Sequence, residues 1–169
     1  MQLQNNRKIA YLSLFIALAM ILSYVESTIP INFGIPGVKI GLANAVSLFL
    51  LYCFGFKYAL IVMTVRVVLT GFLFGNMFSI IYSFAGGIIS LVAMLILKRI
   101  NKFSIIGVSM GGGVFHNLGQ LLIAVFSVKQ LKLAFYGPIL IVSGLIMGFF
   151  IGMIGMMILK RIDVNKLME

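Results

Sequence analysis

The chain has 169 residues, of which 62% are hydrophobic and only 9% are charged, and its formal net charge is +10. Soluble domains carry roughly a quarter of charged residues, so this composition excludes an ordinary soluble domain and indicates a protein surrounded largely by lipid. Nucleic-acid binding is not indicated, because the Lys and Arg residues lie mostly between apolar segments, where such residues set topology and meet anionic lipid.

Six segments are apolar and long enough to cross the hydrocarbon core, which takes about 20 residues. They cover residues 9–27, 40–56, 57–75, 77–97, 104–127 and 138–159. Short connections predict antiparallel neighbours, with Gly55 and Gly75 at tight turns and Pro138 in the first turn of the last helix. We therefore predict an all-α integral membrane protein, with residues 1–169 forming a single domain of six transmembrane helices.

The connection at residues 28–39 is the longest, and its sequence is TIPINFGIPGVK. Pro30 and Pro36 interrupt helix, while Gly34 and Gly37 permit unusual backbone angles. Its apolar residues favour folding back onto the helices. We predict that this loop forms a lid over one end of the bundle.

The basic residues predict the orientation through the positive-inside rule. With the N-terminus inside, one side collects nine of them: Arg7, Lys8, Lys57, Lys98, Arg99, Lys102, Lys160, Arg161 and Lys166. The other side has three, which are Lys39, Lys129 and Lys132. This bias predicts that both termini lie in the cytoplasm and the lid outside. We expect a multi-pass protein of the bacterial inner or plasma membrane.

Ionisable side chains inside a membrane are costly and therefore indicate functional sites. Arg66 lies in the middle of the third span, so it is expected to face a cavity, an anionic partner or an anionic ligand. Glu26 lies at the outer end of the first span, where it can pair with Lys39 or Arg66, contact a ligand, or sit at a solvated helix end. A purely structural pairing of Arg66 stays open as the alternative.

The fifth span has the densest group of polar side chains, His116, Asn117 and Gln120, after three consecutive glycines at 111–113. His116 and Gln120 are four residues apart and share a helix face, which Asn117 borders. The glycines predict close packing or a bend. This cluster indicates a binding role, and interhelical hydrogen bonding is the alternative.

Weaker signals place further polar groups in the outer half of the bundle. Lys39 and Asn44 lie one turn apart beside the lid, and Tyr82 adds a hydroxyl on the fourth span. Ser13 and Ala17 form a small-xxx-small pair on the first span, a spacing that lets helices touch. Packing within the bundle and docking of another membrane subunit both fit this pair.

The acidic residues argue against several enzyme classes. The chain has only three, Glu26, Asp163 and Glu169, so a carboxylate-held magnesium site of the prenyl synthase kind and a carboxylate dyad are not expected. A phosphate-binding loop is missing from the sequence, and the single cysteine, Cys53, offers no Cys/His metal cluster. We expect a binder or carrier and not an enzyme, with no cofactor and no metal.

Four stretches of the chain carry a family resemblance. They are IPGVKIGLANAVSLFLLY at 35–52, RVVLTGFLFG at 66–75, YSFAGGIISL at 82–91 and FSIIGVSMGGGVFHNLGQLL at 103–122. They resemble the Gx transporter family, also described as heptaprenyl diphosphate synthase component I, which is similar to the substrate-binding S subunits of energy-coupling factor transporters. The resemblance implies a six-helix bundle that captures a small molecule under its first loop. It also implies a transmembrane coupling subunit and ATPases as partners, with Ser13 and Ala17 similar to a docking feature.

The leading hypothesis is therefore a substrate-capturing membrane subunit for a small amphipathic molecule such as a flavin, a quinone precursor or a prenylated compound. The expected contacts are Arg66, His116, Asn117, Gln120 and Tyr82, with Lys39, Asn44 and Glu26 at the rim. One alternative is a non-catalytic accessory subunit of heptaprenyl diphosphate or menaquinone synthesis that docks a soluble synthase. Another is a stand-alone channel or secondary carrier.

Overall fold

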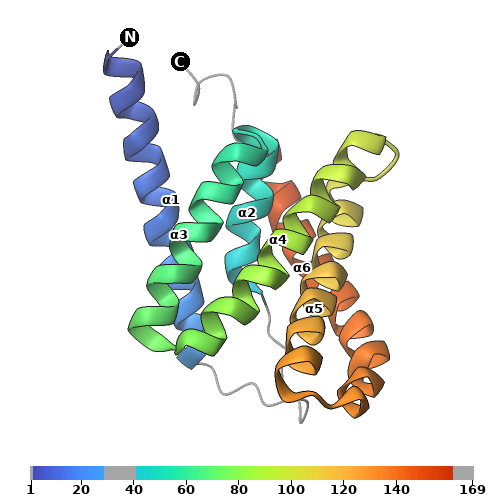
Figure 1. Cartoon of the computed structure of the whole chain (residues 1–169). Helices are drawn as coiled ribbons and strands as arrows, with labels where there is room; N and C mark the ends of the chain where they lie inside the picture. Colours follow the sequence, from blue (N-terminus) through green and yellow to red (C-terminus); the bar gives the residue numbers. More distant parts are fainter. Residues whose placement is uncertain (1, 29–40, 162–169) are drawn as a thin grey trace.

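The computed structural model describes residues 2–28 and 41–161, with side chains described from Ile9 onward. Lys39 and residues 29–39 of the predicted lid lie outside the described residues. The elements are α1 (Gln2–Thr28), α2 (Leu42–Cys53), α3 (Phe56–Phe74), α4 (Met77–Ile100), α5 (Ile105–Val128), the short 3-10 helix η1 (Leu131–Tyr136) and α6 (Gly137–Arg161). Successive α-helices run in alternating directions through one bundle (Figure 1). The described part is thus all-helical, as predicted.

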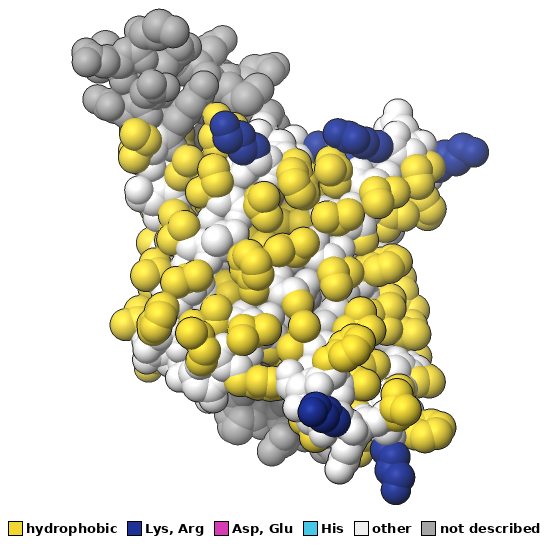
Figure 2. Space-filling model, in the orientation of Figure 1, with side chains coloured by type: hydrophobic (Ala, Val, Ile, Leu, Met, Phe, Trp, Pro, Cys, Tyr) yellow, Lys and Arg dark blue, Asp and Glu magenta, His cyan; other side chains and the backbone are white. Residues whose placement is uncertain are grey.

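The outer surface of the bundle is that of a membrane protein. Five helices are long and apolar enough to span a bilayer, and large hydrophobic side chains such as Phe72, Phe126 and Ile146 are exposed on them. Figure 2 shows hydrophobic side chains over the middle of the visible face and Lys and Arg at its two ends. This distribution matches a hydrocarbon belt between two polar interfaces. The chain is a multi-pass membrane protein.

The second predicted span differs from expectation. Residues 40–56 were predicted to cross the membrane, but α2 has only 12 residues, which corresponds to about 18 Å at 1.5 Å per residue. A hydrocarbon core is about 30 Å thick, so this helix alone does not reach across it. Leu48, Leu50 and Leu51 are completely buried, so α2 is apolar because it forms the centre of the core. The count of six full spans is therefore not confirmed.

The predicted helix boundaries are largely confirmed. Gly55 precedes α3 with φ +89°, an angle that favours glycine, and Gly75 ends α3. Asn76 and Ser79 form a reciprocal capping box at the start of α4. Pro138 lies in the first turn of α6, as predicted. The 3-10 helix η1 was not predicted.

Helix α5 packs against α6 through glycine. A Cβ added to Gly144 would lie 2.8 Å from the backbone carbonyl carbon and oxygen of Gly113, and a Cβ on Gly148 would lie 2.6 Å from the Cα of Met110. On the α4 side, a Cβ on Gly112 would lie 2.6 Å from Met94 Cγ. The close packing predicted from the three glycines is confirmed, because the two helix backbones meet with almost no side chain between them.

Helix α1 joins the bundle differently, through side chains. The Phe15 ring packs at a tilt against Phe49 of α2 at 5.3 Å and edge-to-face against Phe54 at 5.9 Å, measured between ring centroids. The opposite side of the helix is exposed, with Leu14 at 62% and Ile21 at 59% of their maximal accessible surface. One side of α1 is therefore bound to the core while the other is open to lipid or to another protein.

Candidate functional site

A small cavity opens between four helices, α2, α4, α5 and α6. Its polar lining consists of Asn44, Ser90, Ser109, His116 and Asn117, and the remaining lining is Gly, Met and Ile. The cavity volume is about 20 Å³, which holds roughly one water-sized group. A flavin or prenyl compound would need the cavity to widen. Met94 and Met147 are the flexible parts of the wall that can move for this purpose.

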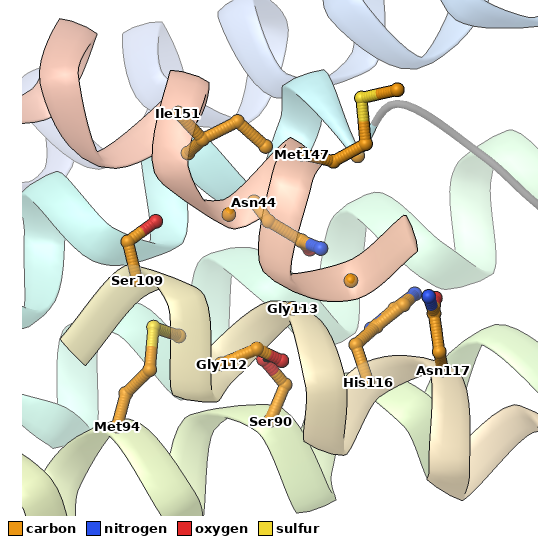
Figure 3. Close-up of a pocket in the computed structure, with 13 residues that line it drawn as sticks. Asn44, Ser90, Met94, Ser109, Gly112, Gly113, His116, Asn117, Met147 and Ile151 are labelled. Carbon is orange, nitrogen blue, oxygen red and sulfur yellow. Dashed lines mark hydrogen bonds between the residues drawn. The ribbon is translucent and has the colours of Figure 1, made fainter. Parts of the chain in front are cut away.

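Asn117 is the most firmly placed polar side chain of the cavity. It is 6% exposed, and its Nδ2 donates to the backbone oxygen of Leu140 at 2.8 Å and to Ser143 Oγ at 3.1 Å. Ser143 Oγ in turn donates to the same Leu140 oxygen at 3.0 Å. In Figure 3 the side chains of His116 and Asn117 rise from α5, and the Asn44 amide enters from α2. These contacts tie α5 to α6 at the cavity.

His116 and Gln120 lie on the α4 side of α5. A Cβ on Gly86 of α4 would lie 2.8 Å from Gln120 Cγ and 3.2 Å from His116 Cε1, so both side chains cross over this glycine. Gln120 is only 1% exposed, and its Oε1 accepts no hydrogen bond from the residues that the structure describes. His116 lines the cavity, whereas Gln120 lies outside its immediate wall.

Sequence reasoning missed two serines of the cavity. Ser90 on α4 and Ser109 on α5 are 2% and 4% exposed, and Ser90 Oγ donates to the Gly112 oxygen at 2.8 Å. The glycines that face these serines were visible in the sequence. However, an isolated serine in a membrane span is too common to be singled out without knowing which face it occupies.

The start of α2 forms one wall of the cavity. Gly41 adopts φ +76° before the first turn of α2, and both Gly41 and Asn44 line the cavity. The Gly41 N–H donates to Glu26 Oε1 of α1 at 2.6 Å. A carboxylate at the N-terminus of a helix complements the helix dipole. Glu26 therefore binds α1 to the start of α2 beside the cavity.

Arg66 is buried but does not line the cavity. Its Nη1 donates to Ser23 Oγ of α1 at 3.4 Å, and it is close enough to Glu26 for the two charges to interact. The structure thus places Arg66 against Ser23 of α1, and the described residues show no ion pair between Arg66 and Glu26, so their pairing stays a prediction. The structure places Asn44, His116 and Asn117 together in a second group.

The other end of α2 is held by a lysine. Lys98 of α4 donates from Nζ to the Leu51 oxygen at 2.8 Å, and the same Nζ lies 4.6 Å from the Tyr52 ring centroid. The short central helix therefore carries an acid at its start and a base at its end, which both complement its dipole. Lys98 was predicted only as part of a basic surface.

The remaining predicted positions lie apart from the cavity. Tyr82 is half-buried and stacks on Phe78 at 5.9 Å, one turn from Gly86 on α4. Ser13 and Ala17 are exposed on α1, and Ser13 Oγ donates to the Ile9 oxygen at 3.0 Å. Within residues 2–28 and 41–161, no group of three His, Cys, Asp or Glu side chains could hold a metal ion.

Comparison with known proteins supports the family resemblance. The model of the family described as heptaprenyl diphosphate synthase component I matches residues 15–158, which covers all of α2–α5, most of α6 and about half of α1. No curated protein and no solved structure matches the chain. Because the family model covers far more than half of the sequence, this multi-pass helical bundle belongs to the heptaprenyl diphosphate synthase component I family.

Proposed function

We propose that the chain is a membrane subunit that captures a small amphipathic molecule for an energy-coupled transporter. The observation that carries the proposal is the convergence of polar side chains from three helices, α2, α4 and α5, on one cavity inside an apolar bundle. Buried polar groups are costly in a membrane protein, and they are retained where they bind one another or a ligand. The apolar and methionine walls suit the hydrophobic part of a flavin, quinone precursor or prenyl compound.

The orientation in this proposal has the N-terminus of α1 and the C-terminal end of α6 in the cytoplasm. The ends of α4 and α6 carry Lys98, Arg99, Lys160 and Arg161. Lys129 and Lys132 lie beyond the opposite end of α5. This charge difference supports an inner basic end. The cavity would then receive its ligand from the outer side, where α2 begins.

The partner in this proposal is a transmembrane coupling subunit with attached ATPases. The exposed side of α1 supports it, because Ser13 and Ala17 present a small-residue surface that the rest of the bundle leaves uncovered. A helix with small residues at this spacing can approach another helix closely. In this role the chain performs no chemistry itself.

Reconstitution tests the proposal. Proteoliposomes that contain the chain, with and without co-expressed coupling subunit and ATPases, would be assayed for uptake of radiolabelled riboflavin, a naphthoquinone precursor and farnesol. Native mass spectrometry of the chain in mild detergent would identify a molecule that co-purifies with it. ATP-dependent uptake supports the proposal, and flux that needs no ATPase supports a stand-alone carrier. The absence of both uptake and bound molecules contradicts ligand capture.

A second candidate function is an accessory subunit that brings a soluble prenyl synthase to the membrane. The family description favours it, and so does the exposed basic end formed by Arg99, Lys102, Lys160 and Arg161. Pull-down from membranes distinguishes the two functions, since the first predicts a coupling subunit and ATPases and the second predicts a prenyltransferase.

A further inference from the structure

We infer that the protein binds the carboxylate or phosphate group of an amphipathic molecule at Arg66, between α1 and α3. For a captured ligand, this inference rests on the proposed function and gives the charge of the ligand. The site is separate from the cavity described above, because the cavity wall does not include Arg66.

Arg66 carries a charge in the interior of the bundle. It is the one Lys or Arg side chain that is buried among the residues that the structure describes, with 9% of its surface exposed. It lies eight residues before the end of α3, which corresponds to about 12 Å below the outer end of that helix. A guanidinium keeps its charge even when it is buried. Such a charge inside a membrane needs an anion or several hydrogen-bond acceptors to offset its lost hydration.

The described residues do not supply these partners. The guanidinium makes one hydrogen bond to them, from Nη1 to Ser23 Oγ, and at 3.4 Å this bond is longer than is usual between an N–H donor and an oxygen. Glu26 is the only acid in the described part of the chain, and it forms no ion pair with Arg66 there. Its Oε1 accepts from the Gly41 N–H at the start of α2, where the helix dipole favours a negative charge. The carboxylate of Glu26 is therefore bound to α2 and not to Arg66.

The unused edge of the Arg66 guanidinium has the geometry that binds an oxyanion. Nε and Nη2 make no hydrogen bond within the described residues, and neither of them is a fully buried atom that lacks a partner. Both nitrogens therefore remain accessible to a small molecule. Their N–H groups point in the same direction from the planar guanidinium, and this arrangement binds two oxygens of a carboxylate or phosphate through parallel hydrogen bonds.

An aromatic pair lies along the same contact between α1 and α3. Tyr24 of α1 contacts Phe74, the last residue of α3, with ring centroids 5.0 Å apart, and both residues are 50% exposed. The hydrophobic part of an amphipathic molecule can pack on these rings while its oxyanion lies at Arg66. A lipid phosphate has the same chemistry, but headgroups lie outside the hydrocarbon core, so it would have to descend along α3 by about 12 Å.

Binding to the purified full-length chain in mild detergent tests the inference with three pairs of compounds. Each pair has the same apolar part with and without a negative charge: 1,4-dihydroxy-2-naphthoic acid and its methyl ester, farnesyl phosphate and farnesol, and flavin mononucleotide and riboflavin. Native mass spectrometry and thermal unfolding would report binding. In at least one pair we expect the charged compound to bind at least about tenfold more tightly than its neutral counterpart.

Two variants connect this preference to Arg66. Arg66→Gln removes the positive charge and keeps a polar side chain, so the charged compound should bind about as weakly as its neutral counterpart. Lys132→Gln is the matched control, because it removes one positive charge from an exposed residue beyond the end of α5, and it should keep the preference. An equal loss of the preference in both variants would show that the overall charge attracts the anion, and it would overturn the site at Arg66.

Reconstitution into nanodiscs distinguishes the two sources of the oxyanion. The discs would contain either phosphatidylcholine alone or phosphatidylcholine with phosphatidylglycerol. Phosphatidylglycerol that stays bound to the unaltered chain, is lost from Arg66→Gln and competes with the small charged compounds assigns the site to a lipid phosphate. Tight binding of a small charged compound in discs of both compositions assigns the site to a free ligand. Both results support an oxyanion at Arg66.

The outcomes separate this inference from the proposed function. If the neutral compound binds as tightly as the charged one in every pair, and no phosphatidylglycerol is retained, the site at Arg66 is overturned and ligand capture still stands. Binding of none of the six compounds and no retained lipid, together with no uptake in proteoliposomes, overturns both. The compound pairs on the unaltered chain decide the question even where Arg66→Gln fails to fold.

Discussion

The two helices at opposite sides of the bundle, α6 and α1, are attached in different ways. Helix α6 meets α5 backbone to backbone along Gly113, Gly144 and Gly148, which we call the glycine seam. Helix α1 meets its neighbours through rings and polar side chains, and its outer face is exposed. The seam therefore fixes the position of Asn117 against α6, whereas α1 is attached by contacts that can be changed singly. The cavity is built on the rigid side of the molecule.

The largest loss of stability is expected from Gly144→Ala, which disrupts the glycine seam. The new Cβ would lie 2.8 Å from three backbone atoms, the carbonyl carbon and oxygen of Gly113 and the Cα of Val114. Backbone cannot move aside as a flexible side chain can, so α5 and α6 must separate. We expect a loss of about 3 kcal/mol or failure to fold, measured by detergent unfolding and size-exclusion profile.

Gly107→Ala is the matched control for that substitution. Its Cβ would have nothing nearer than 3.6 Å, and Gly107 lies in the first turn of α5. Because Ala is the better helix former, stability should stay equal or rise by about 0.5–1 kcal/mol. Equal losses for Gly107→Ala and Gly144→Ala would contradict the backbone contact as the source of rigidity.

The positions of the helices were largely predictable from the sequence. The exception is α2, and it has a physical cause. Hydropathy reports that a segment avoids water, but it does not distinguish lipid from the protein interior. Residues 40–56 were as apolar as a span, yet α2 is short because its side chains pack in the core. The packing of glycines 111–113 was predictable, because few explanations exist for three successive glycines in a helix.

The candidate site was predictable only where polar residues cluster in the sequence. His116, Asn117 and Gln120 stood out on one segment, and two of them line the cavity. Ser90 and Ser109 did not stand out, since their burial depends on the rotation of α4 and α5 about each other. Arg66 stood out because of its charge, but the sequence does not give the direction of its side chain. That direction follows from Ser23 and Glu26 on a helix 40 residues away in the chain.

A smaller loss of stability than for Gly144→Ala is expected where the contact is made by a side chain and not by the backbone. Lys98→Met removes the hydrogen bond to the Leu51 oxygen and the cation–π contact with Tyr52 at the end of α2. We expect a loss of about 1–2 kcal/mol in detergent unfolding. Lys102→Met is the control, because Lys102 is exposed and should change stability by less than about 0.5 kcal/mol. Similar losses of stability for Lys98→Met and Lys102→Met would contradict the role of Lys98 in capping α2.

A double-mutant cycle at Glu26 and Arg66 tests whether these two side chains act together in holding α1. Glu26→Gln keeps an oxygen that accepts from the Gly41 N–H but removes the charge, while Arg66→Met removes the donor to Ser23. We expect each change to destabilise the protein and the pair to be non-additive by about 0.5–1 kcal/mol. Additive losses would show that the two charges act independently, and that the contacts of Glu26 with Gly41 and of Arg66 with Ser23 hold α1 separately.

The smallest change in stability is expected on the outer face of α1, with Ser13→Leu and Ala17→Leu. Both side chains are exposed, so the isolated chain should unfold within about 0.5 kcal/mol of the unaltered protein. If another membrane helix packs on this face, the two leucines prevent the close approach that small residues allow. Co-purification with a coupling subunit and ATP-dependent uptake should then fall sharply while ligand binding persists. Ser127→Leu, exposed near the end of α5, controls for added bulk, and an equal loss of co-purification with it would place the partner contact elsewhere.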